Sequence, residues 1–257
     1  MGKNYKDKVD KINQTKYKSN PSSVLGIDFS NNEGQQRFLR LIQKPDLPYI
    51  FITGEAGTGK NFVATAAALD LVRMQRRYHD IIYCRAAKEV DDGGGLGFLP
   101  GELEEKFSIY CLPLIDTLKS IMKKTDALGG GDGVLRDLMN NVIRCYPPNY
   151  VRGNNWDNAI IIIDEAQNMT YDQLQTLMTR ITDNCKMIIM GSLNQIDLKN
   201  KSVEENGFKL VMDCMNQFQD DGLVGYVELT QSMRSPFCVK IDKALTAFKQ
   251  ARIKGRN

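Results

Sequence analysis

Apolar residues gather in short runs along this chain. The runs lie at Tyr49–Thr53, Ile81–Arg85, Ala159–Ile163, Lys186–Met190 and Tyr226–Leu229. Runs of this length, bounded by polar and turn-forming residues, predict buried β-strands. The run Ala159–Ile163 is apolar at every position, so we expect this strand in the middle of a sheet with both of its faces covered.

Between these runs, apolar residues recur at helical spacing. A short amphipathic helix is predicted to begin at Glu33 and to close at Pro45. Further helices are predicted at residues 62–74, 102–106, 112–123, 135–143, 174–181, 210–218 and 236–249. Strands that alternate with helices predict an α/β fold, with a mostly parallel central sheet flanked by helices on both faces.

The start of the chain differs from the remainder in composition. Residues 1–24 carry lysines with few acidic or apolar residues, so we predict a basic, flexible N-terminal tail. The tail is either simply solvated or an arm that touches phosphates. Residues 25–257 show no internal repeat and no break in composition, which predicts a single domain.

Composition narrows the function classes. Apolar residues make up 42% and charged residues 25% of 257 residues, as in an ordinary globular protein. The apolar runs are too short to span a membrane, and the first residues form no apolar leader, so we expect a cytoplasmic protein. The six cysteines are scattered and are expected to be reduced thiols, while a single histidine disfavours zinc sites and histidine catalysis. The net charge of +3 is weak support for an acidic partner.

A glycine-rich loop joins the first strand to an alanine-rich helix. Strand, glycine loop, lysine and helix, in this order, are the context of a phosphate-binding loop, in which backbone N–H groups and the helix N-terminus face the anion. Lys60 adds a positive charge for the β- and γ-phosphates of ATP, and Asn61 stands where a Ser or Thr hydroxyl usually holds Mg²⁺. The predicted loop comprises Gly54, Glu55, Ala56, Gly57, Thr58, Gly59, Lys60 and Asn61.

Two carboxylates follow the strand that is predicted at the centre of the sheet. Asp164 and Glu165 end the run Ala159–Ile163, and ligands of α/β folds bind outside the carboxyl ends of such strands. We expect Asp164 to hold the Mg²⁺ shell and Glu165 to orient and deprotonate an attacking water. A kinase transfers phosphate to a substrate hydroxyl and needs no carboxylate that activates water. Glu165 therefore favours nucleotide hydrolysis.

Two later polar residues also follow strands. Gln195 comes soon after Lys186–Met190, where a side chain can contact the γ-phosphate and sense its loss. Arg234 follows Tyr226–Leu229, where an arginine can bind phosphate bidentately and stabilise charge in the transition state. Their order after a phosphate loop predicts that both belong to one site.

The motifs together resemble the PhoH family, the phosphate-starvation-inducible P-loop ATPases. The resemblance runs from about Gly26 to the C-terminus, and its most specific parts are GLGFLPG and the VRGNNWDNA–DEAQN stretch. The matching segments are GEAGTGK (54–60), RAAKEV (85–90), GLGFLPGELEEK (95–106), LPLIDTL (112–118), YVRGNNWDNAIIIIDEAQNMT (150–170) and KMIIMGSLNQIDL (186–198).

The resemblance implies a RecA-like core related to the first motor domain of superfamily 1 helicases. It implies ATP binding and hydrolysis with Mg²⁺, action on nucleic acid, above all RNA, and a ring-like homo-oligomer, a hexamer by family expectation. By position, Gln35 resembles the glutamine that reads adenine. Arg152 lies in an Arg-Gly element that meets either nucleic acid or a neighbouring subunit.

Two positions depart from the family pattern. Asn61 replaces Thr, and Ser192 replaces the Asp of the Gly-Asp-x-x-Gln element. Both departures are expected to affect turnover more than nucleotide binding.

We therefore predict an Mg-dependent ATPase that hydrolyses ATP slowly while it binds or remodels single-stranded nucleic acid. The alternative is a non-catalytic nucleotide-binding module whose ATP state sets its assembly. A small-molecule kinase is a more distant third, which Glu165 disfavours.

Overall fold

A computed structural model describes residues 22–86, 103–151, 155–193 and 205–254. Within these residues, six parallel strands form one sheet in the order β5-β4-β6-β7-β3-β8. The strands are β3 (Tyr49–Gly54), β4 (Asp80–Arg85), β5 (Ile143–Tyr146), β6 (Ala159–Asp164), β7 (Lys186–Gly191) and β8 (Val224–Leu229).

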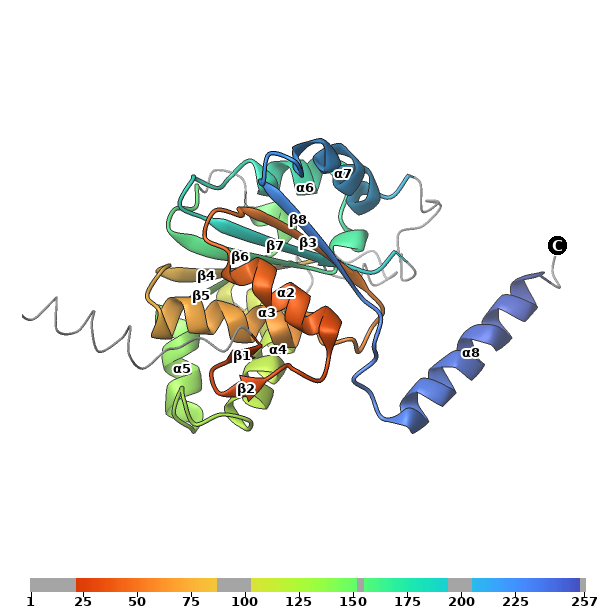
Figure 1. Cartoon of the computed structure of the whole chain (residues 1–257), viewed down its shortest axis with the longest axis horizontal. Helices are drawn as coiled ribbons and strands as arrows, with labels where there is room; N and C mark the ends of the chain where they lie inside the picture. Colours follow the sequence, from red (N-terminus) through yellow and green to blue (C-terminus); the bar gives the residue numbers. More distant parts are fainter. Residues whose placement is uncertain (1–21, 87–102, 152–154, 194–204, 255–257) are drawn as a thin grey trace, which may run out of the picture.

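Helices cover both faces of this sheet, as the alternation of strands and helices predicted. In Figure 1, α2 to α5 lie below the sheet, α6 and α7 lie above it, and α8 stands apart. The helices are α2 (Glu33–Gln43), α3 (Lys60–Leu69), α4 (Leu103–Met122), α5 (Asp132–Asn141), α6 (Tyr171–Met178), α7 (Gly207–Met215) and α8 (Pro236–Lys254). Helix α3 continues into a π-helical turn at Asp70–Met74.

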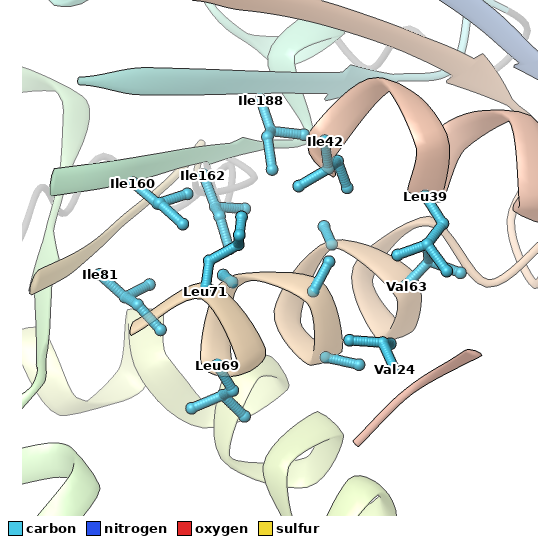
Figure 2. Close-up of a cluster of buried hydrophobic side chains, with 14 of the residues drawn as sticks. Val24, Leu39, Ile42, Val63, Leu69, Leu71, Ile81, Ile160, Ile162 and Ile188 are labelled. Carbon is cyan, nitrogen blue, oxygen red and sulfur yellow. The ribbon is translucent and has the colours of Figure 1, made fainter. Parts of the chain in front are cut away.

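Strand β6 lies in the middle of the sheet, between β4 and β7, as its apolar sequence predicted. Its side chains alternate between two cores. Ile160 and Ile162 pack in the core between the sheet and α2, α3 and α4, which Figure 2 shows. Ile161 and Ile163 pack in the core between the sheet and α6 and α7. Because both faces are buried, every position from Ala159 to Ile163 is apolar, and the strand ends at the buried Asp164.

The structure corrects two predicted helix boundaries. The segments 102–106 and 112–123, predicted as separate helices, belong to the single helix α4, which contains Pro113. Leu114 and Leu118 are buried in this helix, so tertiary packing outweighs the local cost of the proline. The helix predicted to reach Ile143 ends at Asn141, and Ile143 instead begins the edge strand β5.

A small hairpin precedes the main domain. Strand β1 (Ser23–Val24) pairs antiparallel with β2 (Ile27–Asp28), and the side chain of Val24 is buried in the core beneath α2 and α3. Residues 23 and 24 fall within the predicted tail, whose first 21 residues lie outside the described part of the chain.

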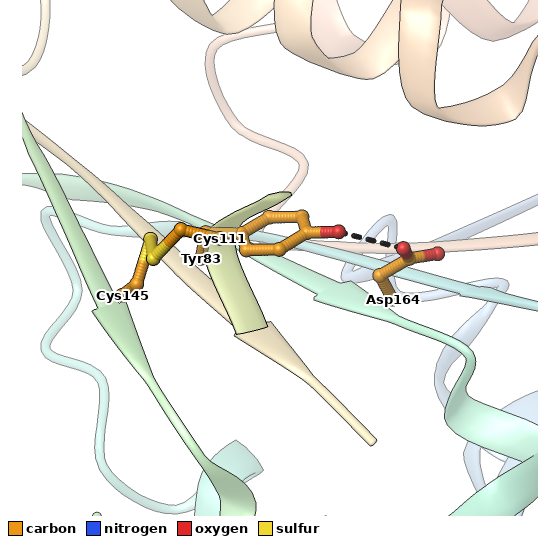
Figure 3. Close-up of a disulfide and its surroundings, with 4 residues drawn as sticks. All are labelled: Tyr83, Cys111, Cys145 and Asp164. Carbon is orange, nitrogen blue, oxygen red and sulfur yellow. Dashed lines mark hydrogen bonds between the residues drawn. A yellow bond between two sulfur atoms is a disulfide. The ribbon is translucent and has the colours of Figure 1, made fainter. Parts of the chain in front are cut away.

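Two cysteines correct the expectation that all of the thiols are reduced. Cys111 of α4 and Cys145 of β5 form a disulfide with a Cα–Cα distance of 6.2 Å (Figure 3). Sequence spacing gives no sign that this helix packs on this strand. Cys84 and Cys185 are buried free thiols, and Cys214 and Cys238 are exposed.

Lys186, at the start of β7, is a buried cation. Its Nζ atom donates to Lys44 O at 2.7 Å and to Leu47 O, so it satisfies one carbonyl at the C-cap of α2 and one in the segment that follows. Burial lowers the pKa of this side chain from 10.5 to about 8.

This lysine predicts a rise in stability with pH. Between pH 8 and 10.5 the unfolded chain keeps a proton that folded Lys186 has released, so the free energy of unfolding increases with pH, by at most about 3 kcal/mol. Urea unfolding of the wild type and of Lys186→Met across this range measures the effect. In the variant, the free energy of unfolding is expected to rise less between pH 8 and 10.5. The same pH dependence in both proteins would contradict a lowered pKa of Lys186.

No helix among the described residues is both long enough and apolar enough to cross a membrane.

Candidate active site

The parallel strands bring their carboxyl ends to one edge of the sheet. Gly54, Arg85, Asp164, Gly191 and Leu229 are the last residues of their strands. Arg85 pairs in register with Asp164, and Gly54 with Leu229. The phosphate loop and the acid pair predicted from separate stretches of sequence are thus at the same edge, where α/β folds bind ligands.

The glycines of the loop adopt conformations that other residues rarely reach. Gly57 and Gly59 have φ values of 81° and 87°. A side chain at Gly57 would begin 2.5 Å from Arg234 Nε, and one at Gly59 would begin 2.5 Å from Gln35 Nε2. At Gly54 the obstacle is the backbone oxygen of Leu229, also at 2.5 Å.

Lys60 begins α3 and points back into the loop. Its Nζ atom donates to Gly54 O at 2.6 Å and to Glu55 O at 2.9 Å, while Thr58 Oγ1 donates to the same Glu55 carbonyl. Burial lowers the pKa of Lys60, and the charges of Glu165 and Asp164 oppose this shift. The ammonium group therefore lies inside the loop and faces the carboxylates beyond it.

Two predicted binding residues hold the outside of the loop. Gln35 is buried in α2, and its Nε2 donates to Thr58 O at 2.9 Å. Arg234 lies against Gly57, and the neighbouring Met233 N–H donates to Gly57 O at 2.7 Å. Gln35 and Arg234, which are about 200 residues apart in sequence, thus both contact the phosphate loop.

Asp164 is held by three donors. Its Oδ2 accepts from the Tyr83 hydroxyl at 2.7 Å (Figure 3) and from Asn61 Nδ2 at 2.9 Å, and its Oδ1 accepts from Glu165 N–H at 2.9 Å. Burial and the charge of Asp164 raise the pKa of Tyr83, so this hydroxyl keeps its proton and remains a donor. The Asn61 bond joins the helix after the phosphate loop to the acid pair.

Glu165 has an unusual backbone and a fixed side chain. Its φ of 55° is in the left-handed region, and its Oε2 accepts from Gln167 Nε2 at 2.6 Å. Gln167 is buried, and its Oε1 accepts from Ser192 N–H at 2.9 Å. A single glutamine thus connects Glu165 with the first residue after β7.

Arg85 faces both acids from the neighbouring strand. Its Nε lies 3.7 Å from Asp164 Oδ2, and its Nη2 lies 3.6 Å from Glu165 Oε1. Arg85, Tyr83 and Gln167 were not predicted as site residues. Arg85 and Gln167 stand in the RAAKEV and DEAQN motifs, a signal that could have found them, but Tyr83 is hidden within an apolar run.

The oxygen atoms beside the acid pair fit Mg²⁺, a hard cation that prefers oxygen ligands. Asn61 Oδ1 is buried, and no group of the described residues donates to it. The Asn61 amide nitrogen must face Asp164, because two oxygens there would repel. Asn61 Oδ1 and the Asp164 carboxylate are therefore oxygen donors of the kind that Mg²⁺ takes.

Two predicted residues, Gln195 and Arg152, lie outside the described part of the chain. Their roles remain predictions.

The family model for PhoH-like proteins matches residues 29–246, which include the loop, the acid pair and Arg234. This chain belongs to the PhoH family. The PhoH-like protein of Bacillus subtilis (strain 168) is 35% identical over 213 residues, which cover 82% of this chain and 61% of that protein. Protein PhoH of Escherichia coli (strain K12) is 32% identical over 234 residues, or 90% of this chain and 60% of that protein. The chain thus spans about three fifths of the length of these PhoH relatives.

A solved structure shows the same fold outside the PhoH family. The large terminase from a thermophilic bacteriophage superposes with a TM-score of 0.50 at 13% identity, over 77% of this chain and 45% of that chain. The expected fold, a mostly parallel central sheet flanked by helices, is confirmed.

The asparagine that departs from the PhoH pattern yields a prediction about metal affinity. A Thr hydroxyl is carried on a short, stiff side chain, whereas the Asn61 amide oxygen has a further torsion to order. We expect Asn61→Thr to lower the Mg²⁺ concentration that half-saturates ATP turnover. Asn61→Ala, which lacks the oxygen, should raise that concentration by about tenfold.

The measurement is a Mg²⁺ titration of ATP turnover, together with Mn²⁺ binding followed by electron paramagnetic resonance. ATP affinity should change little in either variant. If Asn61→Thr weakens metal binding as much as Asn61→Ala does, then Asn61 acts mainly through its bond to Asp164.

Proposed function

We propose that this PhoH-family chain binds Mg-ATP and hydrolyses it, slowly, while it acts on single-stranded nucleic acid. The observation that carries the proposal is the 2.9 Å hydrogen bond from Asn61, one residue after the loop lysine, to Asp164. It joins the phosphate loop to the acid pair, the two parts that nucleotide hydrolysis requires.

In this proposal, Lys60 and the backbone N–H groups of residues 54–61 bind the phosphates. Asn61 Oδ1 and Asp164 would hold Mg²⁺, which supplies positive charge that stabilises the negative charge developing on the phosphates. Tyr83 keeps Asp164 oriented through its hydroxyl bond.

Glu165 receives the proton of the attacking water at its carboxylate. The bond from Gln167 fixes one oxygen, so the direction of the carboxylate is set before substrate arrives. Arg234, which lies against the loop, adds positive charge to the bound phosphates. Gln195 senses the γ-phosphate and Gln35 reads the adenine, by family position.

Membership of the PhoH family supports RNA as the nucleic acid and a homo-oligomer as the working form. The alternative, a nucleotide-binding module that does not turn over, is favoured by one observation: Asn61 replaces the usual hydroxyl at the metal. Phosphate release without any acceptor separates the two functions, since only an ATPase produces it.

The test is ATP turnover with and without single-stranded RNA and DNA. We expect turnover to rise with a strand, and the strand's effect to fall steeply as salt increases, because binding through lysines and arginines releases counterions. Glu165→Gln serves as the blank for contaminating activity. Wild-type turnover equal to this blank would favour the alternative, and an effect independent of salt would exclude electrostatic strand binding.

A further inference from the structure

Helix α8 presents an apolar stripe to solvent. It stands away from the sheet and the other helices in Figure 1, and of its described side chains only Val239 is not exposed. The stripe consists of Phe237 (72% exposed), Ile241 (44%) and Leu245 (65%). These positions follow the spacing i, i+4 and i+8, so they share one side of the helix.

With this stripe exposed, α8 gains little from packing on the described part of its own domain. Helices are marginal in water when no packing of an apolar face supports them. A contiguous exposed apolar surface marks an interaction site rather than a random surface. The sequence of α8 is also basic, since five lysines and arginines accompany a single acid, Asp242. A fitting partner therefore offers apolar and acidic groups together.

The chain itself carries such a surface on the outer side of α7 and the turn after it, which we call the α7 patch. Its apolar members are Leu210 (42% exposed), Phe218 (36%) and Leu223 (43%). Its acidic members are Asp213, Asp220 and Asp221, all exposed. Lys209 pairs with Asp213, and the other two acids add to the negative charge of the patch.

We propose that the stripe of α8 docks on the α7 patch of a second copy of this chain. The two surfaces match in apolar character and are opposite in charge. In Figure 1, α7 lies at the top of the molecule and α8 projects from its lower side, so the contact joins different surfaces of two copies. Such a heterologous contact builds rings or filaments.

Docking of α8 would also bear on the active site. Helix α8 begins two residues after Arg234, and Asp242 Oδ2 lies 3.9 Å from Arg234 Nη1. A neighbour that fixes α8 therefore fixes the segment that lays Arg234 on the phosphate loop. This inference deepens the homo-oligomer of the proposed function, but it does not depend on ATP hydrolysis.

The test uses two variants that each break one side of the contact. Leu245→Glu puts a negative charge in the stripe, and Leu210→Lys puts a positive charge in the α7 patch. Each is expected to weaken self-association of the full chain by at least about tenfold. Ala247→Glu is the matched control, since it adds the same charge at an exposed position off the stripe and should assemble like the wild type.

Light scattering on nuclease-treated, lipid-free protein measures the masses. Each variant alone should run at the 29.0 kDa of one chain. An equimolar mixture should give a species of twice this mass, because the intact α8 of the Leu210→Lys copy fits the intact patch of the Leu245→Glu copy. Thermal unfolding and ATP-analogue binding confirm that both variants are folded.

Three results would overturn the proposal. The first is a wild type that stays monomeric, or that assembles only with added RNA or lipid vesicles. The second is Leu210→Lys protein that assembles like the wild type, which would indicate contact between two α8 helices. The third is a mixture that remains monomeric although both variants are folded. Since none of these readouts uses turnover, a failure here is distinct from a failure of the ATPase proposal.

Discussion

Replacing Glu165 by glutamine is expected to stop ATP hydrolysis and to leave ATP bound. Glutamine has nearly the same shape, so it keeps the left-handed backbone of residue 165, whose φ is 55°, without a new clash. It loses the ability to accept the proton of water. Positioned general bases contribute about 10²- to 10⁴-fold, so turnover should fall by at least about 100-fold.

The measurement is phosphate release together with binding of a fluorescent ATP analogue. Glu228→Gln is the control, because it removes a carboxylate from the exposed side of β8 and should keep both properties. Turnover at the wild-type rate by Glu165→Gln would show that another group activates water. Loss of ATP binding would instead indicate that Glu165 helps to hold the nucleotide or the metal.

Replacing Lys60 by alanine is expected to abolish detectable ATP binding at micromolar concentrations. In the described structure the ammonium group is bonded to the carbonyls of Gly54 and Glu55, so it already lies within the loop. Its loss removes charge-assisted bonds to phosphate of about 1.5–3 kcal/mol, which corresponds to about 100-fold in affinity at the upper end.

Lys124→Ala is the matched control for this loss of charge. Lys124 Nζ lies 5.0 Å from the ring centroid of Phe62 in α3 and is not part of the loop, so ATP affinity should be unchanged. Titration calorimetry gives both affinities, and thermal unfolding shows whether the variants fold. Undiminished binding by folded Lys60→Ala would contradict the loop's assigned role.

The layers of the fold could be predicted from the sequence, because it shows both the apolar runs of buried strands and the helical spacing of apolar residues on the helices. The continuous run at Ala159–Ile163 has no polar face, and the structure buries it on both sides. Strand β5 escaped prediction, since four residues at the sheet edge, of which Arg144 is exposed, carry too short a pattern. The disulfide of Cys111 also escaped it, because residues 34 apart in sequence meet only through the packing of α4 on that edge.

The candidate site was predictable where the chemistry is local in sequence. Lys60, Asp164 and Glu165 stand in motifs whose spacing carries the inference. The supporting bonds are different, since they join residues from separate elements. Tyr83 reaches Asp164 from the neighbouring strand, and its place within an apolar run indicates only burial. Gln167 lies beside the acids in sequence, but its bond to Ser192 depends on the order of strands in the sheet.

The crowding around the loop glycines has a consequence for how variation in this family is interpreted. A side chain at Gly54 would strike the Leu229 backbone. One at Gly57 or Gly59 would meet the side chain of Arg234 or Gln35 and would also need a φ of 81° or 87°, which residues other than glycine rarely adopt. A library of loop variants screened for folding alone, with no nucleotide in the assay, should therefore still reject most replacements of Gly54. Retention of Gly54 across a set of sequences would then report on the scaffold, whereas retention of Lys60 would report on the ligand.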